Sequence, residues 1–255
     1  PELPATTLAE QCYWYMFKGC TSLVQAPELP ATTLARSCYS GMFYGCTSLT
    51  TVPELQATTL AVQCYSNMFR DCTSLTTAPE LPVTTLEERC YGEMFYGCTS
   101  LTQAPELPAT TLVNGCYNQM FKGCSNLNYI KCLATDIISA YNRTNSWVNG
   151  VSATGTFVKD VNSSWTVGDS GIPEGWIVEE VINAVTFTAE ESGSTIGLIS
   201  LSSNQTLEYK TASSDWTSMS TSTNITLDNI GDKVYVRGML SEDNTYSNNT
   251  QFTMT

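Results

Sequence analysis

The sequence predicts an α/β solenoid of stacked strand–helix coils, followed by a cap and then by a small all-β sandwich. A 26-residue unit recurs five times without a slip, beginning at Pro1, Pro27, Pro53, Pro79 and Pro105. The repeat decays in a sixth copy, and short segments of alternating polar and apolar residues come later in the chain. We therefore expect a solenoid over residues 1–135, a cap or linker over 136–182 and a β-sandwich over 183–255.

Eight apolar columns are the same in all five units. They are Leu3, Leu8, Cys12, Tyr13, Met16, Phe17, Cys20 and Leu23, with their copies 26 residues apart. A fixed period means that each unit is one supersecondary piece, which buries its apolar side only against its neighbours. The period lies within the 20–29 residues of leucine-rich repeats, so the chain is expected to form an α/β leucine-rich-repeat solenoid.

Within each unit we expect a helix and a strand. The apolar columns at unit positions 8, 12 and 16 are four residues apart, which predicts a helix of about three turns over residues 6–17. Thr6 or Thr7 can cap its start, and Gly19 stands where a helix C-cap requires positive φ. The Thr-rich segment 21–27 ends in proline and predicts the strand.

Five unit positions, 10, 11, 14, 15 and 18, change from copy to copy. We expect them to face solvent, because a stacked core would not accept such changes in size and charge. Aromatic and basic side chains at positions 14, 15 and 18 are the candidate partner-binding residues, with neutral drift of an exposed surface as the alternative explanation. They are Trp14, Tyr15, Lys18, Tyr44, Arg70, Tyr96 and Lys122.

The pattern MFxGCTSLTxAPELPxTTL resembles the BspA-like leucine-rich repeats of surface proteins from anaerobic gut and mouth bacteria. The residues that match this family's AF-x-GC-x-SL core and its IP step are Met16-Phe17, Gly19-Cys20, Ser22-Leu23 and Ala26-Pro27. The chain departs from the family in having Cys-Tyr where Ile-Gly is more usual, and in a more helical middle. The resemblance covers residues 1 to about 135. It implies a surface-exposed or secreted protein with a binding or adhesive role, and it brings no catalytic residue and no ligand.

The C-terminal half is expected to cover the solenoid and then to form a second domain. Residues 136–180 hold Trp147, Phe157, Trp165 and Trp176, and we expect them to cap the last coil. From Asn183 on, segments rich in Thr, Tyr, Val and Ile alternate with turn residues. This pattern predicts a small all-β immunoglobulin-like sandwich, with Trp216 as a plausible core anchor.

Three repeated columns, of cysteine, glutamate and tyrosine, each allow a functional and a structural interpretation. The eleven cysteines are expected to be buried thiols filling the core, although disulfides between coils stay open. A zinc site is not expected, because the C-x₂-C and His spacings are absent. The glutamate column from Glu2 to Glu106 is read as a solvated edge rather than a Ca²⁺ stripe. The tyrosine column from Tyr13 to Tyr117 is read as core packing rather than a platform for sugar.

Composition limits the classes of function. The net charge is −13 and the sequence pI about 4.3, which argues against a nucleic-acid partner. Histidine is absent, so the commonest general base and metal ligand is missing and no catalysis, metal or cofactor is expected.

We therefore expect a cell-surface or secreted protein that binds a host or bacterial surface protein or a glycan. Its signal peptide, and a segment that anchors it to a membrane without embedding it, are expected upstream of Pro1. The alternative hypothesis is a structural stalk or spacer module of a larger surface protein.

Overall fold

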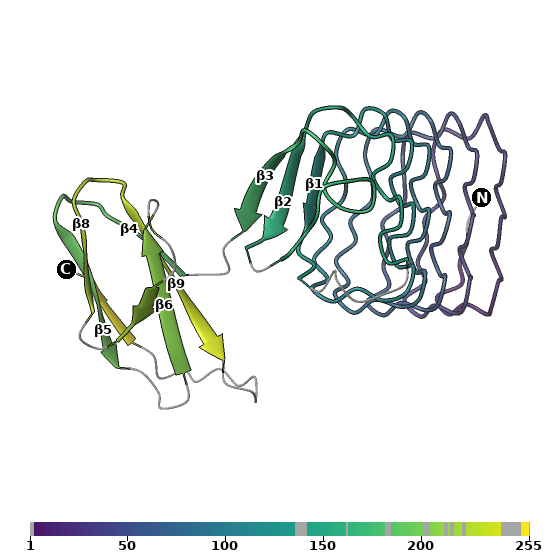
Figure 1. Ribbon diagram of the computed structural model, residues 1–255. Helices are drawn as coiled ribbons and strands as arrows, with labels where there is room; N and C mark the ends of the chain where they lie inside the picture. Colours follow the sequence, from purple (N-terminus) through teal and green to yellow (C-terminus); the bar gives the residue numbers. More distant parts are fainter. Residues whose placement is uncertain are drawn as a thin grey trace. The chain divides into compact units, whose positions relative to one another are not determined.

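The computed structural model describes residues 3–135, 142–161, 163–181, 185–200, 205–211, 214, 217–220, 223–240 and 251–254. They belong to two compact units, Pro1–Val181 and Ile182–Thr255 (Figure 1). The first unit contains the coils together with the residues expected to cap them. The division falls one residue before the expected start of the β-sandwich at 183.

Every regular element of the described residues is a β-strand, and these residues contain no helix. The first unit holds β1 (Tyr129–Cys132), β2 (Thr156–Asp160) and β3 (Ile177–Val181). The second unit holds β4 (Val185–Thr188), β5 (Ser194–Ser200), β6 (Gln205–Thr211), β7 (Thr217–Met219), β8 (Asn224–Leu227), β9 (Lys233–Leu240) and β10 (Gln251–Met254). The expected α/β class is therefore wrong for the coils, although their repeat organisation is present.

The helix prediction for residues 6–17 is wrong because most of this segment is a run of overlapping turns. Its N–H groups alternate between two kinds of partner. The N–H of Trp14 donates to the carbonyl oxygen of Gln11 at 3.2 Å, within the same coil. The N–H of Tyr13 donates to the carbonyl oxygen of Cys38, in the next coil, at 2.9 Å. Alternate donors thus depend on the neighbouring coil, so this backbone is satisfied only in a stack.

The four-residue period of the apolar columns belongs to this run of turns. Backbone φ is positive at every fourth residue, with 56° at Gln11, 53° at Tyr15 and 71° at Gly19. In an α-helix of 3.6 residues per turn, a four-residue spacing slips by about 40° at each step. Apolar residues that recur at every fourth unit position, at 8, 12, 16 and 20, therefore fit this run of turns better than they fit a helix. The positive φ expected in the Gly19 column is confirmed, including 58° at Asp71.

The strand expected over residues 21–27 is reduced to isolated parallel bridges such as Gln25 with Thr51. Proline at the first position of the next unit explains this, because it has no N–H to continue the ladder. In the sixth unit Lys131 replaces that proline, and there the ladder extends into β1. β1 pairs in parallel with β2, and β2 with β3 (Figure 1).

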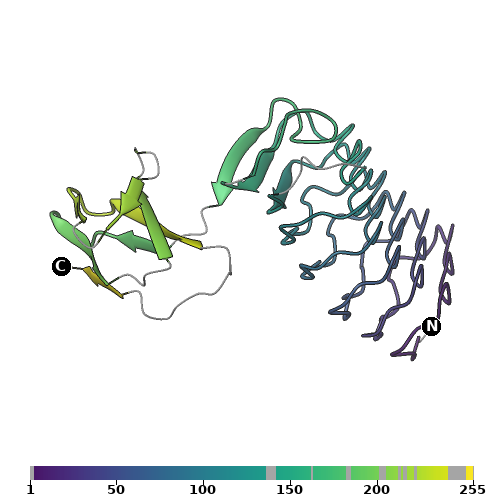
Figure 2. The same ribbon diagram turned by 60° about the horizontal axis from the view of Figure 1, so that its bottom comes forward.

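The repeated apolar side chains form continuous buried columns. In coils two to five the Cys, Met, Phe and Tyr columns and the leucine column at unit position 23, which includes Leu75, are at most 2% exposed. Neighbouring Phe rings stack at 5.6–5.8 Å between centroids and Tyr rings at 5.7–6.3 Å. The first coil has one uncovered face, where Met16 is 50% exposed. Figure 2 shows the coils fanning apart toward the side on which the chain begins.

The coil geometry continues into a sixth coil, beyond the point where the sequence loses its period. Positive φ at Asn142, Ser146 and Gly150 follows that at Gly115, Gln119 and Gly123 after 27 residues instead of 26. One extra residue therefore shifts the columns, so the sixth coil does not follow the 26-residue period of the first five. Trp147 takes the place of the methionine, and its ring stacks on Tyr117 at 6.2 Å and on Trp165 at 5.3 Å. These rings cover the end of the core.

The second unit consists of two antiparallel sheets in the residues that the structure describes. Their strand orders are β10-β5-β8 and β4-β9-β6-β7. A separate hydrophobic cluster that includes Ile196, Leu227 and Val234 forms the core. Trp216, the expected core anchor, lies outside the described residues. An immunoglobulin-like relationship stays a prediction.

Candidate binding surface

The side chains at unit position 18 alternate between cations and aromatic rings along the solenoid. In order, they are Lys18, Tyr44, Arg70, Tyr96 and Lys122. The Nζ of Lys18 lies 4.9 Å from the centroid of the Tyr44 ring, and the guanidinium carbon of Arg70 lies 4.0 Å from that of Tyr96. Arg70 also lies 5.5 Å from the Tyr44 ring, and Lys122 Nζ 5.8 Å from the Tyr96 ring. Each ring therefore contacts a cation from the coil before it and one from the coil after it.

Trp14 and Tyr15 extend this row at the first coil. The Tyr15 ring lies 4.7 Å from Lys18 Nζ and meets the Tyr44 ring edge-on at 6.0 Å. Trp14 lies 5.1 Å from Tyr15 and is 53% exposed, more than any other described tryptophan. All seven sequence-derived candidates thus form one row, which we call the cation–aromatic strip.

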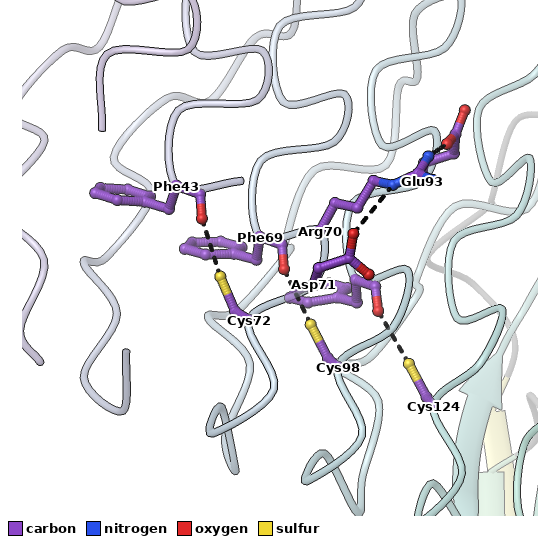
Figure 3. Close-up of polar contacts among 9 residues, drawn as sticks. Phe43, Phe69, Arg70, Asp71, Cys72, Glu93, Cys98 and Cys124 are labelled. Carbon is purple, nitrogen blue, oxygen red and sulfur yellow. Dashed lines mark hydrogen bonds and ion pairs between the residues drawn. The ribbon is translucent and has the colours of Figure 1, made fainter. Parts of the chain in front are cut away.

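The central cation of the strip has acidic partners, whereas the two terminal lysines have none among the described residues. Arg70 forms an ion pair with Glu93, and its Nε lies 3.6 Å from Asp71 Oδ2 (Figure 3). Among the described residues, Lys18 and Lys122 form no ion pair with an acidic side chain. In a protein of net charge −13, the strip therefore presents two ammonium groups without a carboxylate partner.

Sequence reasoning did not count Glu93 and Asp71, which hold Arg70 in place, among the candidate binding residues. Asp71 was visible as the one exception in the glycine column at unit position 19. In the next coil, a Cβ on Gly97 would lie 2.2 Å from Asp71 Oδ1. The sequence signal for this contact was therefore a large side chain in one coil followed by glycine at the same unit position of the next coil.

The same pairing places Tyr15 over Gly41, and replacing Gly41 with alanine is expected to displace the ring. A Cβ at position 41 would lie 2.2 Å from Cε1 of Tyr15. Backbone φ at Gly41 is 62°, so the alanine also costs about 1 kcal/mol in backbone strain. NMR should show the ε-methylene protons of Lys18 moving toward random-coil shifts as the Tyr15 ring leaves.

Asn67→Ala is the matched control for this prediction. Asn67 holds the same unit position in the next coil with a φ of 57°, so the variant tests a similar backbone with no tyrosine to displace. Lys18 shifts that are unchanged in Gly41→Ala would contradict the proposed packing.

The expectation that all variable positions face solvent is wrong at unit position 14 in coils two to four, and at position 11 for Ser37. Ser37, Ser40 and Ser66 are 5%, 7% and 9% exposed, because the turns fold these positions against the adjacent coil. Coils two to four accept only small residues at position 14, namely Ser40, Ser66 and Gly92. The large Trp14 fits in the first coil because no described residue covers it there.

The cysteines are unpaired, and nine of the eleven are buried as expected, whereas Cys12 and Cys20 of the first coil are exposed. All eleven cysteines are free, and the thiol of Cys98 donates to the carbonyl oxygen of Phe69 at 3.0 Å (Figure 3). Burial raises the pKa of the Cys64 thiol to about 12 and that of Cys46 to about 11. Such thiols stay protonated near neutral pH, when they are poor nucleophiles and metal ligands.

The structure also favours core packing for the tyrosine column and a solvent-exposed edge for the glutamate column. The tyrosines of coils two to five are buried and stacked, so their rings pack the core. Glu28, Glu54, Glu80 and Glu106 are exposed. No group of three or more potential metal ligands occurs among the described residues. The same residues contain no helix that is long and apolar enough to cross a bilayer.

One family model matches the chain, that of the BspA type leucine rich repeat region in six copies. Its matches cover residues 9–128 and 65–146 and so span more than half of the 255 residues. Comparison with curated proteins and with solved structures finds no match.

Proposed function

Because the chain belongs to the BspA-type leucine-rich-repeat family, we propose that it is a cell-surface or secreted binding protein whose solenoid recognises a protein or a glycan. Proteins of this family are commonly associated with the cell surface and with adhesion. The proposed location is therefore extracellular or at the cell surface. The ligand is held without chemical conversion.

The observation that carries the proposal is the cation–aromatic strip. Of the side chains at the five variable unit positions, the strip gathers all the aromatic ones and three of the cations in one continuous row. Rings and cations that are already ordered against each other lose little conformational entropy when a ligand binds. The exposed Trp14 indole supplies an apolar contact, and Lys18 and Lys122 supply charged donors.

A binding role without catalysis is also favoured by the chemistry that the chain offers. It has no histidine, and the buried thiols have a raised pKa. The net charge of −13 opposes binding to nucleic acid or to anionic lipid, so a protein or glycan ligand is the better candidate.

The test removes exposed parts of the strip without touching the core. The purified chain is screened on glycan arrays and on immobilised host matrix proteins. The variant Trp14→Ser, Lys18→Ser, Lys122→Ser is then compared for each ligand found. We expect its affinity to fall at least about tenfold, because loss of one well-packed tryptophan at an interface can by itself cost about 2 kcal/mol or more.

The matched control is Val24→Ser, Arg36→Ser, Arg89→Ser. It also removes two cations and one exposed apolar side chain, and all three residues are exposed. Equal loss of affinity in both variants would show that the strip is not the site. If the parent chain binds nothing on either array, the structural stalk becomes the better explanation.

A further inference from the structure

A row of cavities lies between the Pro-Glu-Leu segments of successive coils, away from the residues of the strip. One cavity of about 470 Å³ is lined by residues 52–56 and by 78–80 and 82. A second of about 360 Å³ is lined mainly by residues 78–82 and by Pro105, Glu106 and Pro108. A third of about 370 Å³ lies at the first coils, between Leu3-Pro4 and residues 25–30. We call this row the proline–glutamate groove.

The walls of the cavities combine apolar side chains with glutamates, and the three cavities lie between the first and second, the third and fourth, and the fourth and fifth coils. In the first cavity they include Leu55 and Ala78 together with Pro53 and Pro79. The proline rings are rigid and have no N–H to satisfy, so the walls need no rearrangement to accept an apolar chain.

A row of exposed carboxylates accompanies the cavities. Glu54, Glu80 and Glu106 each line at least one of them, and Glu28 lines the cavity at the first coils. Among the described residues, Glu28 and Glu80 have no ion pair and accept no hydrogen bond. Glu54 accepts only one, from Gln56 at 3.2 Å. Three successive carboxylates lack a cationic side-chain partner, so charge complementarity favours a basic occupant of the groove.

The chain itself shows how a lysine engages this row. In the sixth unit Lys131 replaces the first proline, and its Nζ lies 2.8 Å from Oε1 of Glu106 in the preceding coil. The lysine side chain is only 24% exposed, so its aliphatic stem is largely covered while its ammonium group reaches the carboxylate. The other glutamates of the row have no equivalent of Lys131.

We infer that the proline–glutamate groove binds an extended basic segment of a partner protein, with Lys or Arg at every second residue. An extended chain advances about 6.6 Å in two residues, close to the 5.6–6.3 Å between stacked rings of successive coils. One basic side chain then meets one glutamate per coil, with its stem in the apolar cavity. This surface is separate from the cation–aromatic strip, and the inference does not depend on the strip's ligand.

The test uses the full 255-residue chain and a fluorescein-labelled ten-residue peptide of alternating lysine and threonine. Fluorescence anisotropy at low salt gives its affinity. In the variant Glu28→Gln, Glu54→Gln, Glu80→Gln we expect the affinity to fall about tenfold, since each exposed ion pair contributes modestly. In the control Glu10→Gln, Glu87→Gln, Glu88→Gln, which changes the net charge equally at other exposed glutamates, we expect a change of less than about twofold.

A second peptide tests the cavities separately from the charges. It carries diaminopropionate in place of lysine, which keeps a cation but removes most of the aliphatic stem. We expect it to bind about tenfold more weakly than the lysine peptide, because the stem no longer fills the cavities. Absence of binding to the parent chain, equal weakening in both glutamine variants, or equal affinity for both peptides would each overturn the inference.

Discussion

Replacing Leu75 with aspartate is expected to unfold the whole solenoid rather than one coil. Leu75 is fully buried in the middle coil, within a leucine column that continues through Leu49 and Leu101. The variant loses about 3 kcal/mol of apolar burial and adds a carboxylate without a partner, so the total cost exceeds about 5 kcal/mol. That is comparable to the whole stability of a domain. Since coils are held only by their neighbours, disrupting the middle one exposes the faces of two more.

Scanning calorimetry of the full chain checks this prediction. We expect the transition of the first unit to be lost, while that of the second unit stays. Thr76→Asp is the control, because it places the same charge on an exposed neighbour. A solenoid transition that is unchanged in Leu75→Asp would refute the account of the stacked core.

Raising the pH from 7 to 10 is also expected to unfold the solenoid. Nine thiols are buried in it, those of Cys38, Cys46, Cys64, Cys72, Cys90, Cys98, Cys116, Cys124 and Cys132. Burial raises the pKa of Cys116 to about 11 and that of Cys132 to about 12, above the ordinary 9.0. Their contribution to stability is therefore complete below pH 9 and is lost as the pH rises toward 11–12.

The size of this effect comes from the number of thiols. At pH 10 each thiol that stays protonated in the fold but ionises in the unfolded chain costs about 1.4 kcal/mol. Nine such thiols remove on the order of 10 kcal/mol, which equals the stability of a typical domain.

Calorimetry and near-ultraviolet circular dichroism under anaerobic, reducing conditions measure the alkaline transition. The second unit contains no cysteine and provides an internal control in the same sample. A melting temperature of the solenoid that is equal at pH 7 and pH 10 would contradict the prediction.

The conformation within each coil was the part that sequence reasoning missed. Apolar residues at positions 8, 12 and 16 were compatible with a helix of three turns, and the helix assignment rested on them. The turns are selected because alternate N–H groups, such as those of Tyr13 and Phe17, find carbonyl oxygens in the next coil. A local pattern cannot reveal a donor whose partner lies 25 residues away.

The sequence predicted the seven candidate residues individually, but it did not predict that they lie together in one row. Each of its seven members was identified because it varied where the other columns did not. The alternating cations and rings come into contact only because successive coils stack closely, which places Lys18 between the rings of Tyr15 and Tyr44. The groove was missed because the proline and glutamate columns are uniform, and uniformity was taken as structural.

The sequence by itself determined the repeat, its family, the buried columns and the positive φ of the glycine column, because identical side chains at a fixed spacing must stack in register. Only the tertiary structure decided that the coils contain turns instead of helices. It also revealed a sixth coil behind a one-residue insertion, and it brought scattered cations and rings into one strip. The physical reason is that hydrogen bonds and ring contacts between coils join residues 25 to 29 positions apart, where the local pattern carries no information about the partner.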